Sequence, residues 1–218
     1  MRLLGLLCAA CALGALVGCS SGEKVVPNPL PATHGGLTTP GPGLTGPGAL
    51  VSAVSPDLIT IPARPQIVGR LDVPITRSWQ YIVIHHSDTD SGNERIFDSF
   101  HRKIKGWAGI GYHFVIGNGT DSGNGTIEVT FRWEEQMHGA HAGVDEYNQR
   151  GIGICLVGNF SRSLPTEQQM ASLAFLVTYL QEKCRIPTSN ILLHRQIKNT
   201  DCPGANFPYY RFLSLLAH

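Results

Sequence analysis

The sequence has no surplus of charge of either sign. Its 218 residues carry 17 Lys and Arg against 16 Asp and Glu, which gives a formal net charge of +1. Affinity for nucleic acid depends mainly on clustered bases that neutralise many phosphates, and this chain has no such excess. The composition therefore excludes a protein that binds the phosphate backbone.

The N-terminal apolar run is too short to cross a bilayer. The uncharged segment Leu3–Val17 follows Arg2 and has 15 residues, whereas a membrane-spanning helix needs roughly 20. A short basic start, an apolar run and a small-residue exit are typical of a secretory signal. We expect residues 1–18 to be a signal peptide. An uncleaved anchor is the alternative, and both readings export the protein.

Residues 19–74 have few charges and few aromatic side chains. Between Ser20 and Pro74 the chain has 10 prolines and 8 glycines but only three acids and three bases. Such a segment buries too little apolar surface to offset the entropy lost on ordering. We therefore expect a flexible tether, in which Leu58–Ile61 alternates like a short strand that would dock on the domain.

Residues 75–218 have the composition of a folded domain, with only four of the 14 prolines and eight of the nine histidines. Short apolar runs predict buried strands, and apolar residues at helical spacing predict helices between them. The expected strands are 81–84, 111–116, 152–157 and 191–193. The expected helices are 94–105, one opened by Thr166 with a capping box to Gln169, and one starting at Asn206. This alternation predicts a sheet flanked by helices.

Three potential metal ligands follow these strands. His85 comes directly after the first apolar run, His194 directly after Leu193, and Cys202 eight residues later. Two imidazoles and a thiolate are a known ligand set for catalytic zinc, which keeps its fourth position open. The alternative is a cysteine peptidase that uses Cys202 with His194 as its base, and this reading leaves His85 unexplained.

Six short motifs follow one another across residues 75–218. They are Ile82-Val83-Ile84-His85-His86-Ser87; Gly106-Trp107 with Ile110-Gly111-Tyr112-His113-Phe114; Gly139-Ala140-His141-Ala142-Gly143; Asn148 with Ile152-Gly153-Ile154; Val157-Gly158-Asn159-Phe160; and His194-Arg195 through Thr200, Cys202, Pro203 and Gly204. In this order they resemble the zinc amidases that cut peptidoglycan between muramic acid and L-alanine. That group includes the peptidoglycan recognition proteins and the amidase-type phage lysozymes.

The resemblance implies a fold and a ligand set. The fold is α/β, with a central mixed β-sheet flanked by helices. The ligands of a Zn²⁺ ion are His85, His194 and Cys202. Adjacent strand residues point to opposite faces of a sheet, so His86 is expected to serve packing or to support the ligands from behind, and not to bind the same metal.

The resemblance also implies roles for three other residues. Tyr112 would hydrogen-bond the attacking water or the developing oxyanion, and Thr200 would help to hold the tetrahedral intermediate. His141 resembles a cleft histidine that contacts substrate. The alternatives are a buried core tyrosine at position 112 and a simple surface-loop histidine at position 141.

The implied activity is zinc-dependent hydrolysis of the bond between N-acetylmuramic acid and L-alanine in peptidoglycan or muropeptides, by a monomer. Some cell-wall-recycling members have a glutamate general base where Cys155 stands, so this chain falls on the phage-lysozyme side. The alternative is a non-hydrolytic peptidoglycan-binding lipoprotein of the same fold. Such proteins typically lack the ligand cysteine, which is present here as Cys202.

The end of the signal, Leu16-Val17-Gly18-Cys19, resembles a bacterial lipobox. The resemblance implies lipidation of Cys19 and an exported, membrane-anchored lipoprotein of the cell envelope. Ser20 favours sorting to the outer membrane, facing the periplasm, and the sequence does not decide which membrane holds the lipid. Cys8 and Cys11 leave with the signal, and we expect Cys155 and Cys184 to be reduced.

Lipid attachment predicts that Cys19→Ala removes incorporation of a fatty-acid analogue, because the acylated thiol is deleted. Metabolic labelling of cells that express the full chain measures this. Equal labelling of Cys19→Ala and wild type would contradict a lipoprotein.

Overall fold

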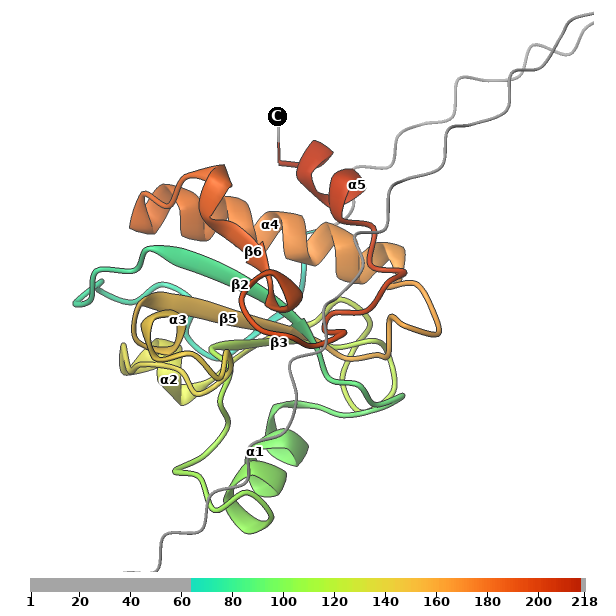
Figure 1. Ribbon diagram of the computed structural model, residues 1–218, viewed down its shortest axis with the longest axis horizontal. Coiled ribbons are helices and arrows are strands. Elements are labelled where there is room, and N and C mark those ends of the chain that lie inside the picture. Colours follow the sequence, from blue (N-terminus) through green and yellow to red (C-terminus); the bar gives the residue numbers. More distant parts are fainter. Residues whose placement is uncertain (1–63, 217–218) are drawn as a thin grey trace, which may run out of the picture. The chain divides into compact units, whose positions relative to one another are not determined.

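A six-stranded sheet forms the centre of the domain (Figure 1). The computed structural model describes residues 64–216. The strands are β1 (Ile67–Val68), β2 (Tyr81–His86), β3 (Phe114–Ile116), β4 (Ile127–Val129), β5 (Gly151–Leu156) and β6 (Ile191–Leu193). Their order is β1-β4-β3-β5-β2-β6, with β3 and β4 antiparallel and all other neighbours parallel. The expected mixed sheet is confirmed.

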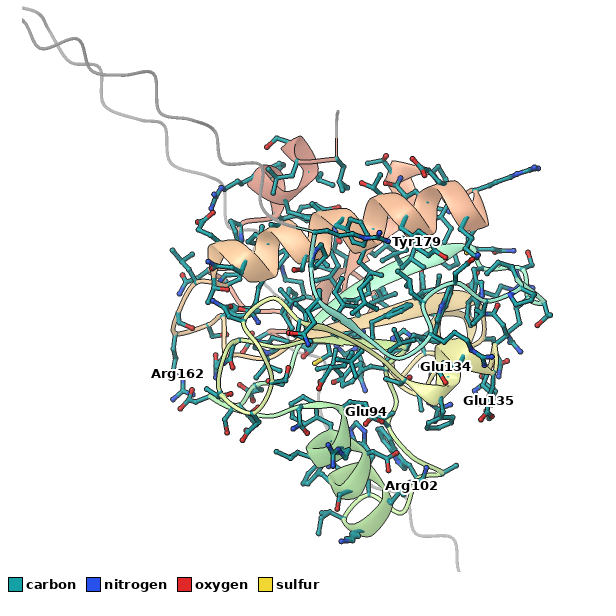
Figure 2. All side chains as sticks on the ribbon, turned by 180° about the vertical axis from the view of Figure 1, so that it is seen from behind. Glu94, Arg102, Glu134, Glu135, Arg162 and Tyr179 are labelled. Carbon is teal, nitrogen blue, oxygen red and sulfur yellow. The ribbon has the colours of Figure 1, made fainter. Side chains whose placement is uncertain are left out.

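Helices lie on both sides of this sheet. They are α1 (Glu94–Lys103), α2 (Phe131–Glu134), α3 (Asp145–Arg150), α4 (Glu167–Cys184) and α5 (Tyr209–Ser214), with 3₁₀ turns at Thr188–Asn190 and His194–Gln196. Figure 2 shows Tyr179 of α4 and Arg102 of α1 on opposite sides of the sheet. Within residues 64–216, no helix has the length and apolar character needed to cross a membrane.

The long helix α4 begins where the sequence predicts. The Thr166 side chain accepts from the backbone N–H of Gln169, and the Gln169 side chain accepts from the backbone N–H of Thr166, so the capping box is complete. The apolar side of the helix, including Leu173 and Val177, is buried in the larger core cluster. The sheet face beneath α4 is therefore part of the larger core.

Alternation along the strands separates two faces. Ile84 and Ile154 belong to the core cluster beneath α4, whereas Cys155 belongs to a smaller cluster on the other face. His85 pairs in register with Cys155, and neighbouring residues in register share a face. His85 therefore lies on the face away from α4, while the ring of His86 lies on the α4 side and accepts from the backbone N–H of Phe160 at 3.1 Å.

The apolar side of α1 does not enter the core. Only Phe97 is buried there, while Ile96, Phe100 and Ile104 are 46%, 47% and 69% exposed. The helical spacing is therefore correct, but it marks a surface beside the sheet and not an interior contact.

The folded domain starts before Ile75. Residues 64–74 were expected to be the end of a tether, but β1 pairs with β4 in parallel and Leu71 and Val73 are buried in the larger core. The backbone carbonyl of Leu71 also accepts from the indole of Trp133 at 2.8 Å. The expected signal peptide, Cys19 and the strand at 58–61 lie outside the described residues.

Because Leu71 is only 8% exposed in this core, Leu71→Ala should lower the free energy of unfolding by about 2 to 3 kcal/mol. Leu164→Ala removes the same atoms from a side chain that is 67% exposed. This variant should change the free energy of unfolding by less than about 0.5 kcal/mol. Urea unfolding of both variants measures the difference. Equal stabilities would show that residues before Ile75 do not contribute to the core.

Candidate metal centre

Two neighbouring strands bring the expected histidines together. In the parallel pairing of β2 with β6, Ile84 lies in register with Leu193. The next residue of each chain is a histidine, and the ring centroids of His85 and His194 are 4.4 Å apart. Cys202 reaches the same point from the loop that follows β6, and the potential donor atoms of the three side chains lie within 4.8 Å of one another.

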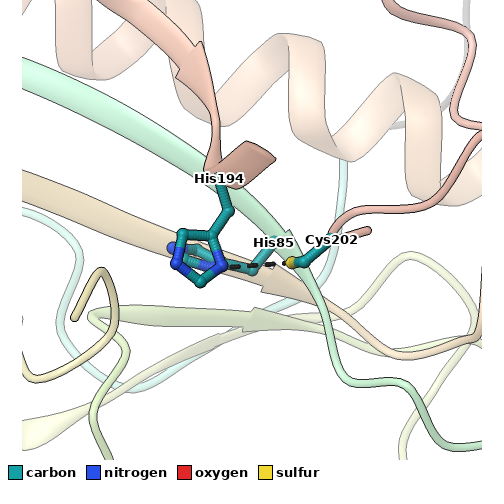
Figure 3. Close-up of side chains that lie close together, drawn as sticks. All are labelled: His85, His194 and Cys202. Carbon is teal, nitrogen blue, oxygen red and sulfur yellow. Dashed lines mark hydrogen bonds between the residues drawn. The ribbon is translucent and has the colours of Figure 1, made fainter. Parts of the chain in front are cut away.

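The separation of these donors fits zinc. The Nδ1 atom of His85 lies 3.7 Å from the Sγ atom of Cys202 (Figure 3). Zn–S bonds of about 2.3 Å and Zn–N bonds of about 2.0–2.1 Å at a tetrahedral angle would separate nitrogen and sulfur by about 3.6 Å. Two imidazoles and one thiol are also a donor set that zinc prefers. The residues present therefore fit the ion.

Each donor residue has a second contact that orients it. The Nε2 atom of His85 lies 3.0 Å from Nδ1 of His141, and Nε2 of His194 lies 3.0 Å from the carbonyl oxygen of Ala142. The backbone N–H of His86 donates to Sγ of Cys202 at 3.4 Å. Such partners fix the side of each ligand that faces a metal.

Burial controls the protonation of the three donors. It lowers the pKa of His85 well below its ordinary value, and the neighbouring His141 and His194 lower it further. Burial also lowers the pKa of His194, so both rings are neutral and have a lone pair to donate at neutral pH. In the metal-free chain burial raises the pKa of the Cys202 thiol to about 12.

Tyr112 lies beside His85 and is only partly buried. It precedes β3 instead of belonging to a strand, and its ring centroid is 5.3 Å from that of His85. Burial raises its pKa well above the ordinary value, and the thiols of Cys155 and Cys202 raise it further. Its hydroxyl is therefore protonated at neutral pH and is able to donate a hydrogen bond.

Thr200 and His141 are held in place within the protein. The Thr200 hydroxyl accepts from the backbone N–H of Cys202 at 3.3 Å, so Thr200 holds the backbone of the loop that carries the thiol. His141 is only 9% exposed, and both of its ring nitrogens have partners, which are His85 and the carbonyl of Gly151. Burial lowers its pKa to about 4. Both ring nitrogens of His141 are thus used within the protein, and the substrate contact expected from the sequence stays a prediction.

A groove of about 500 Å³ begins at Tyr112. Its wall includes the α1 side chains Ile96, Phe97 and Phe100, and residues 87–91 form the other side. No motif in the sequence predicts this groove. The apolar side of α1 is the signal that could have revealed it, because exposed apolar side chains often line binding sites.

The two remaining cysteines of the described chain lie on opposite faces of the sheet. Cys155 is buried in the smaller cluster, and Cys184 packs against the larger one at the end of α4. Both are free cysteines in the structure, as expected.

The sequence comparison defines the family. The family of N-acetylmuramoyl-L-alanine amidases matches residues 75–205, which is more than half of the chain. This segment contains all three donors, Tyr112 and most of the sheet. The chain belongs to this amidase family.

Two curated relatives match the same region. Peptidoglycan-recognition protein LB of Drosophila melanogaster is 33% identical over 134 residues, which cover 57% of this chain and 54% of that protein. N-acetylmuramoyl-L-alanine amidase of Sus scrofa is 29% identical over 143 residues, which cover 60% of this chain and 22% of that protein. The matched part is thus about half and about a fifth of these relatives.

Solved structures show the same fold. The N-acetylmuramoyl-L-alanine amidase LysC from Clostridium intestinale URNW is 33% identical with a TM-score of 0.58, and the match covers 70% of this chain and 97% of that chain. Peptidoglycan recognition protein LE in complex with tracheal cytotoxin is 27% identical with a TM-score of 0.52, over 67% of this chain and 86% of that chain.

The raised pKa of Cys202 predicts slow alkylation of the metal-free chain. A thiol with a pKa of about 12 is about one part in 10⁴ thiolate at pH 8, and the thiolate is the reactive form. The rate with iodoacetamide should therefore rise about tenfold per pH unit from pH 7 to 9. Mass spectrometry of the Cys202 peptide after chelator treatment measures the rate of alkylation. A rate that is already constant over this range would indicate an activated cysteine nucleophile instead.

Proposed function

We propose that this protein is a zinc-dependent amidase that hydrolyses the bond between N-acetylmuramic acid and L-alanine in peptidoglycan. The observation that carries the proposal is that Tyr112 contacts both the cluster of potential zinc ligands and the groove. One side of this residue faces the cluster of His85, His194 and Cys202, and the other lines the groove. A family of amidases supplies the reaction class.

His85, His194 and Cys202 are the residues that would hold the ion. A zinc ion bound by three protein ligands acts as a Lewis acid, polarises a carbonyl group and lowers the pKa of bound water to about 7. The chain contributes neutral imidazoles and a thiol whose Sγ already accepts a backbone hydrogen bond. These features prepare the donors for a cation.

Tyr112 is the residue that acts on the reacting amide. Its protonated hydroxyl donates a hydrogen bond to the oxygen on which negative charge develops as water attacks the carbonyl carbon. The Thr200 hydroxyl accepts from the backbone N–H of Cys202, and its own proton would be a second donor to the developing oxyanion. One proton of the attacking water passes to the amide nitrogen as the bond between this nitrogen and the carbonyl carbon breaks, so that L-alanine leaves as an amine and the muramic acid keeps a carboxylic acid.

The groove beside Tyr112 would bind the sugar and peptide that flank the scissile bond. Its apolar wall on α1 is suited to sugar-ring faces and aliphatic stem residues, and its polar side carries Asp88 and Asp90. The complex of a related recognition protein contains tracheal cytotoxin, a monomeric diaminopimelic acid-type peptidoglycan. We therefore propose peptidoglycan or muropeptides as the partner, bound by a monomer.

The geometry favours this reaction over a cysteine peptidase. The hydrogen-bond partner of the Cys202 thiol among the histidines is Nδ1 of His85, while Nε2 of His194 is directed to the Ala142 carbonyl. Burial keeps the thiol protonated in the metal-free chain. A nucleophilic cysteine needs a lowered thiol pKa instead.

The location of the substrate agrees with the proposed export. Peptidoglycan lies outside the cytoplasmic membrane, so an amidase with a signal peptide and a lipid at Cys19 would be anchored within reach of it. We propose an exported, membrane-anchored lipoprotein on these grounds. The Pro- and Gly-rich residues that follow Cys19 would separate the domain from the membrane surface.

The metal proposal predicts one zinc ion per chain. Cys202→Ser should lower zinc content strongly, because it removes one of three ligands, whereas Cys184→Ser should keep it, because that thiol lies in α4. Elemental analysis measures both. Mass spectrometry of digested peptidoglycan should show free stem peptides that begin with L-alanine only for the zinc-loaded forms. Bound but uncut muropeptides would instead indicate a binding protein.

Tyr112→Phe should lower turnover by about 10² to 10³ without loss of zinc, because it deletes one donor to the oxyanion and no ligand. Turnover on muropeptides, zinc content and melting temperature are measured on the same preparation. A core tyrosine would behave differently, with lower stability and unchanged turnover. Wild-type turnover in the zinc-loaded variant would exclude Tyr112 from the reaction.

A further inference from the structure

One loop contacts both histidines of the metal centre. Gly139–Gly143 precedes α3, and its motif has no role in the proposed reaction. The His141 ring meets Nε2 of His85 at 3.0 Å, and the next carbonyl, of Ala142, meets Nε2 of His194 at 3.0 Å. Consecutive residues thus hold the two ligands that come from different strands.

The partners of these rings determine where their protons lie. A backbone carbonyl oxygen only accepts, so Nε2 of His141, 3.1 Å from the Gly151 oxygen, carries the proton of that neutral ring. Its Nδ1 atom then accepts, and the proton of His85 must lie on Nε2. The lone pair of His85 is left on Nδ1, the atom that faces the Cys202 sulfur.

His194 reaches the same state by a shorter route. Its Nε2 atom donates directly to the carbonyl oxygen of Ala142, which leaves its lone pair on Nδ1. Both histidines therefore present the same ring atom to a metal. Neither ring needs to turn or exchange a proton before it binds.

Asn148 of α3 holds the loop itself. Its Oδ1 atom accepts from the backbone N–H groups of both His141 and Ala142, each at 2.8 Å. Its carbonyl oxygen accepts from the N–H of Gly139 at 2.8 Å. One side chain thus fixes the backbone of the two residues that contact the ligands.

The residue that packs against the His141 ring, Gly153, cannot carry a side chain. A Cβ atom on Gly153 of β5 would lie 2.5 Å from Cγ of the His141 ring, closer than real side chains approach. Only glycine leaves room for the ring at this position. The strand that pairs with β2 is thereby shaped to accept His141.

We infer that His141, the Ala142 carbonyl and Asn148 form a clamp that sets the orientation and tautomer of His85 and His194 for zinc. The inference rests on the proposed zinc site and gives these residues a positioning role. It explains why the ring of His141 is buried and has no nitrogen left for substrate.

Zinc affinity of purified variants tests the clamp. His141→Leu and Asn148→Ala should each weaken zinc binding by about 10- to 100-fold in competition with a chelator. His141→Asn keeps an acceptor near the place of Nδ1, and Asn148→Asp keeps an acceptor for both N–H groups. These two should recover most of the affinity. Wild-type affinity in folded His141→Leu and Asn148→Ala would overturn the clamp.

A matched control separates positioning from general loss of stability. Ser172→Ala deletes a buried hydroxyl of α4 that donates to the Gly125 carbonyl, on the sheet face away from the donors. It should leave zinc affinity within about twofold of wild type, since no contact of a ligand changes. An equal loss of affinity in Ser172→Ala would attribute the effect to stability and overturn the clamp.

The tautomers give a readout that needs no metal. Nitrogen-15 NMR of the chelator-treated wild type should show Nε2–H forms for His85, His141 and His194. In His141→Leu only His85 should change to a mixture of forms. An Nδ1–H form of His85 in the wild type would overturn the clamp. Failure of the wild type to bind zinc would instead count against the proposed function, while the tautomers still decide the inference.

Discussion

The parallel pairing of β2 with β6 is the interaction on which the candidate metal centre depends. The register of Ile84 with Leu193 places the next residues, both histidines, side by side at one end of the sheet. A slip of one residue would turn His85 to the opposite face. Burial of Ile82 and Ile84 beneath α4 prevents that slip, so packing on one face fixes the chemistry on the other.

Burial also couples the metal to protons. The surroundings that keep His85 and His194 neutral raise the pKa of the Cys202 thiol to about 12 in the metal-free chain. A thiolate in that place requires a nearby positive charge. Binding of zinc would therefore release the thiol proton, and zinc affinity would rise with pH until the metal-free thiol itself ionises.

The sequence predicts the strands that carry the site and the beginning of α4, because apolar runs and a capping box are local signals. The resemblance implies the three donors, which the structure brings together. The packing of residues 64–74 could not be predicted, since Leu71 and Val73 lie in a Gly- and Pro-rich segment and are buried only by contacts distant in the sequence. The helices α2 and α3 have four and six residues, too few to show a helical period.

In the candidate site, too, the sequence predicts local features but not contacts between residues that are distant in the sequence. The resemblance implies substrate contact for His141, but the sequence does not reveal that its ring lies between His85 and the Gly151 carbonyl. The helical spacing predicted α1, but it could not show that most of the apolar side of this helix is exposed. Its true neighbours, residues 87–91 and Tyr112, come together only in the folded sheet.

The zinc site can be tested by X-ray absorption spectroscopy at the zinc edge of the loaded protein. We expect one sulfur ligand at about 2.3 Å and two imidazole nitrogens at about 2.0–2.1 Å, with one further light atom. In Cys202→Ser the sulfur contribution should disappear. A first shell without sulfur in the wild type, or with more than one sulfur, would contradict a zinc site made of His85, His194 and Cys202.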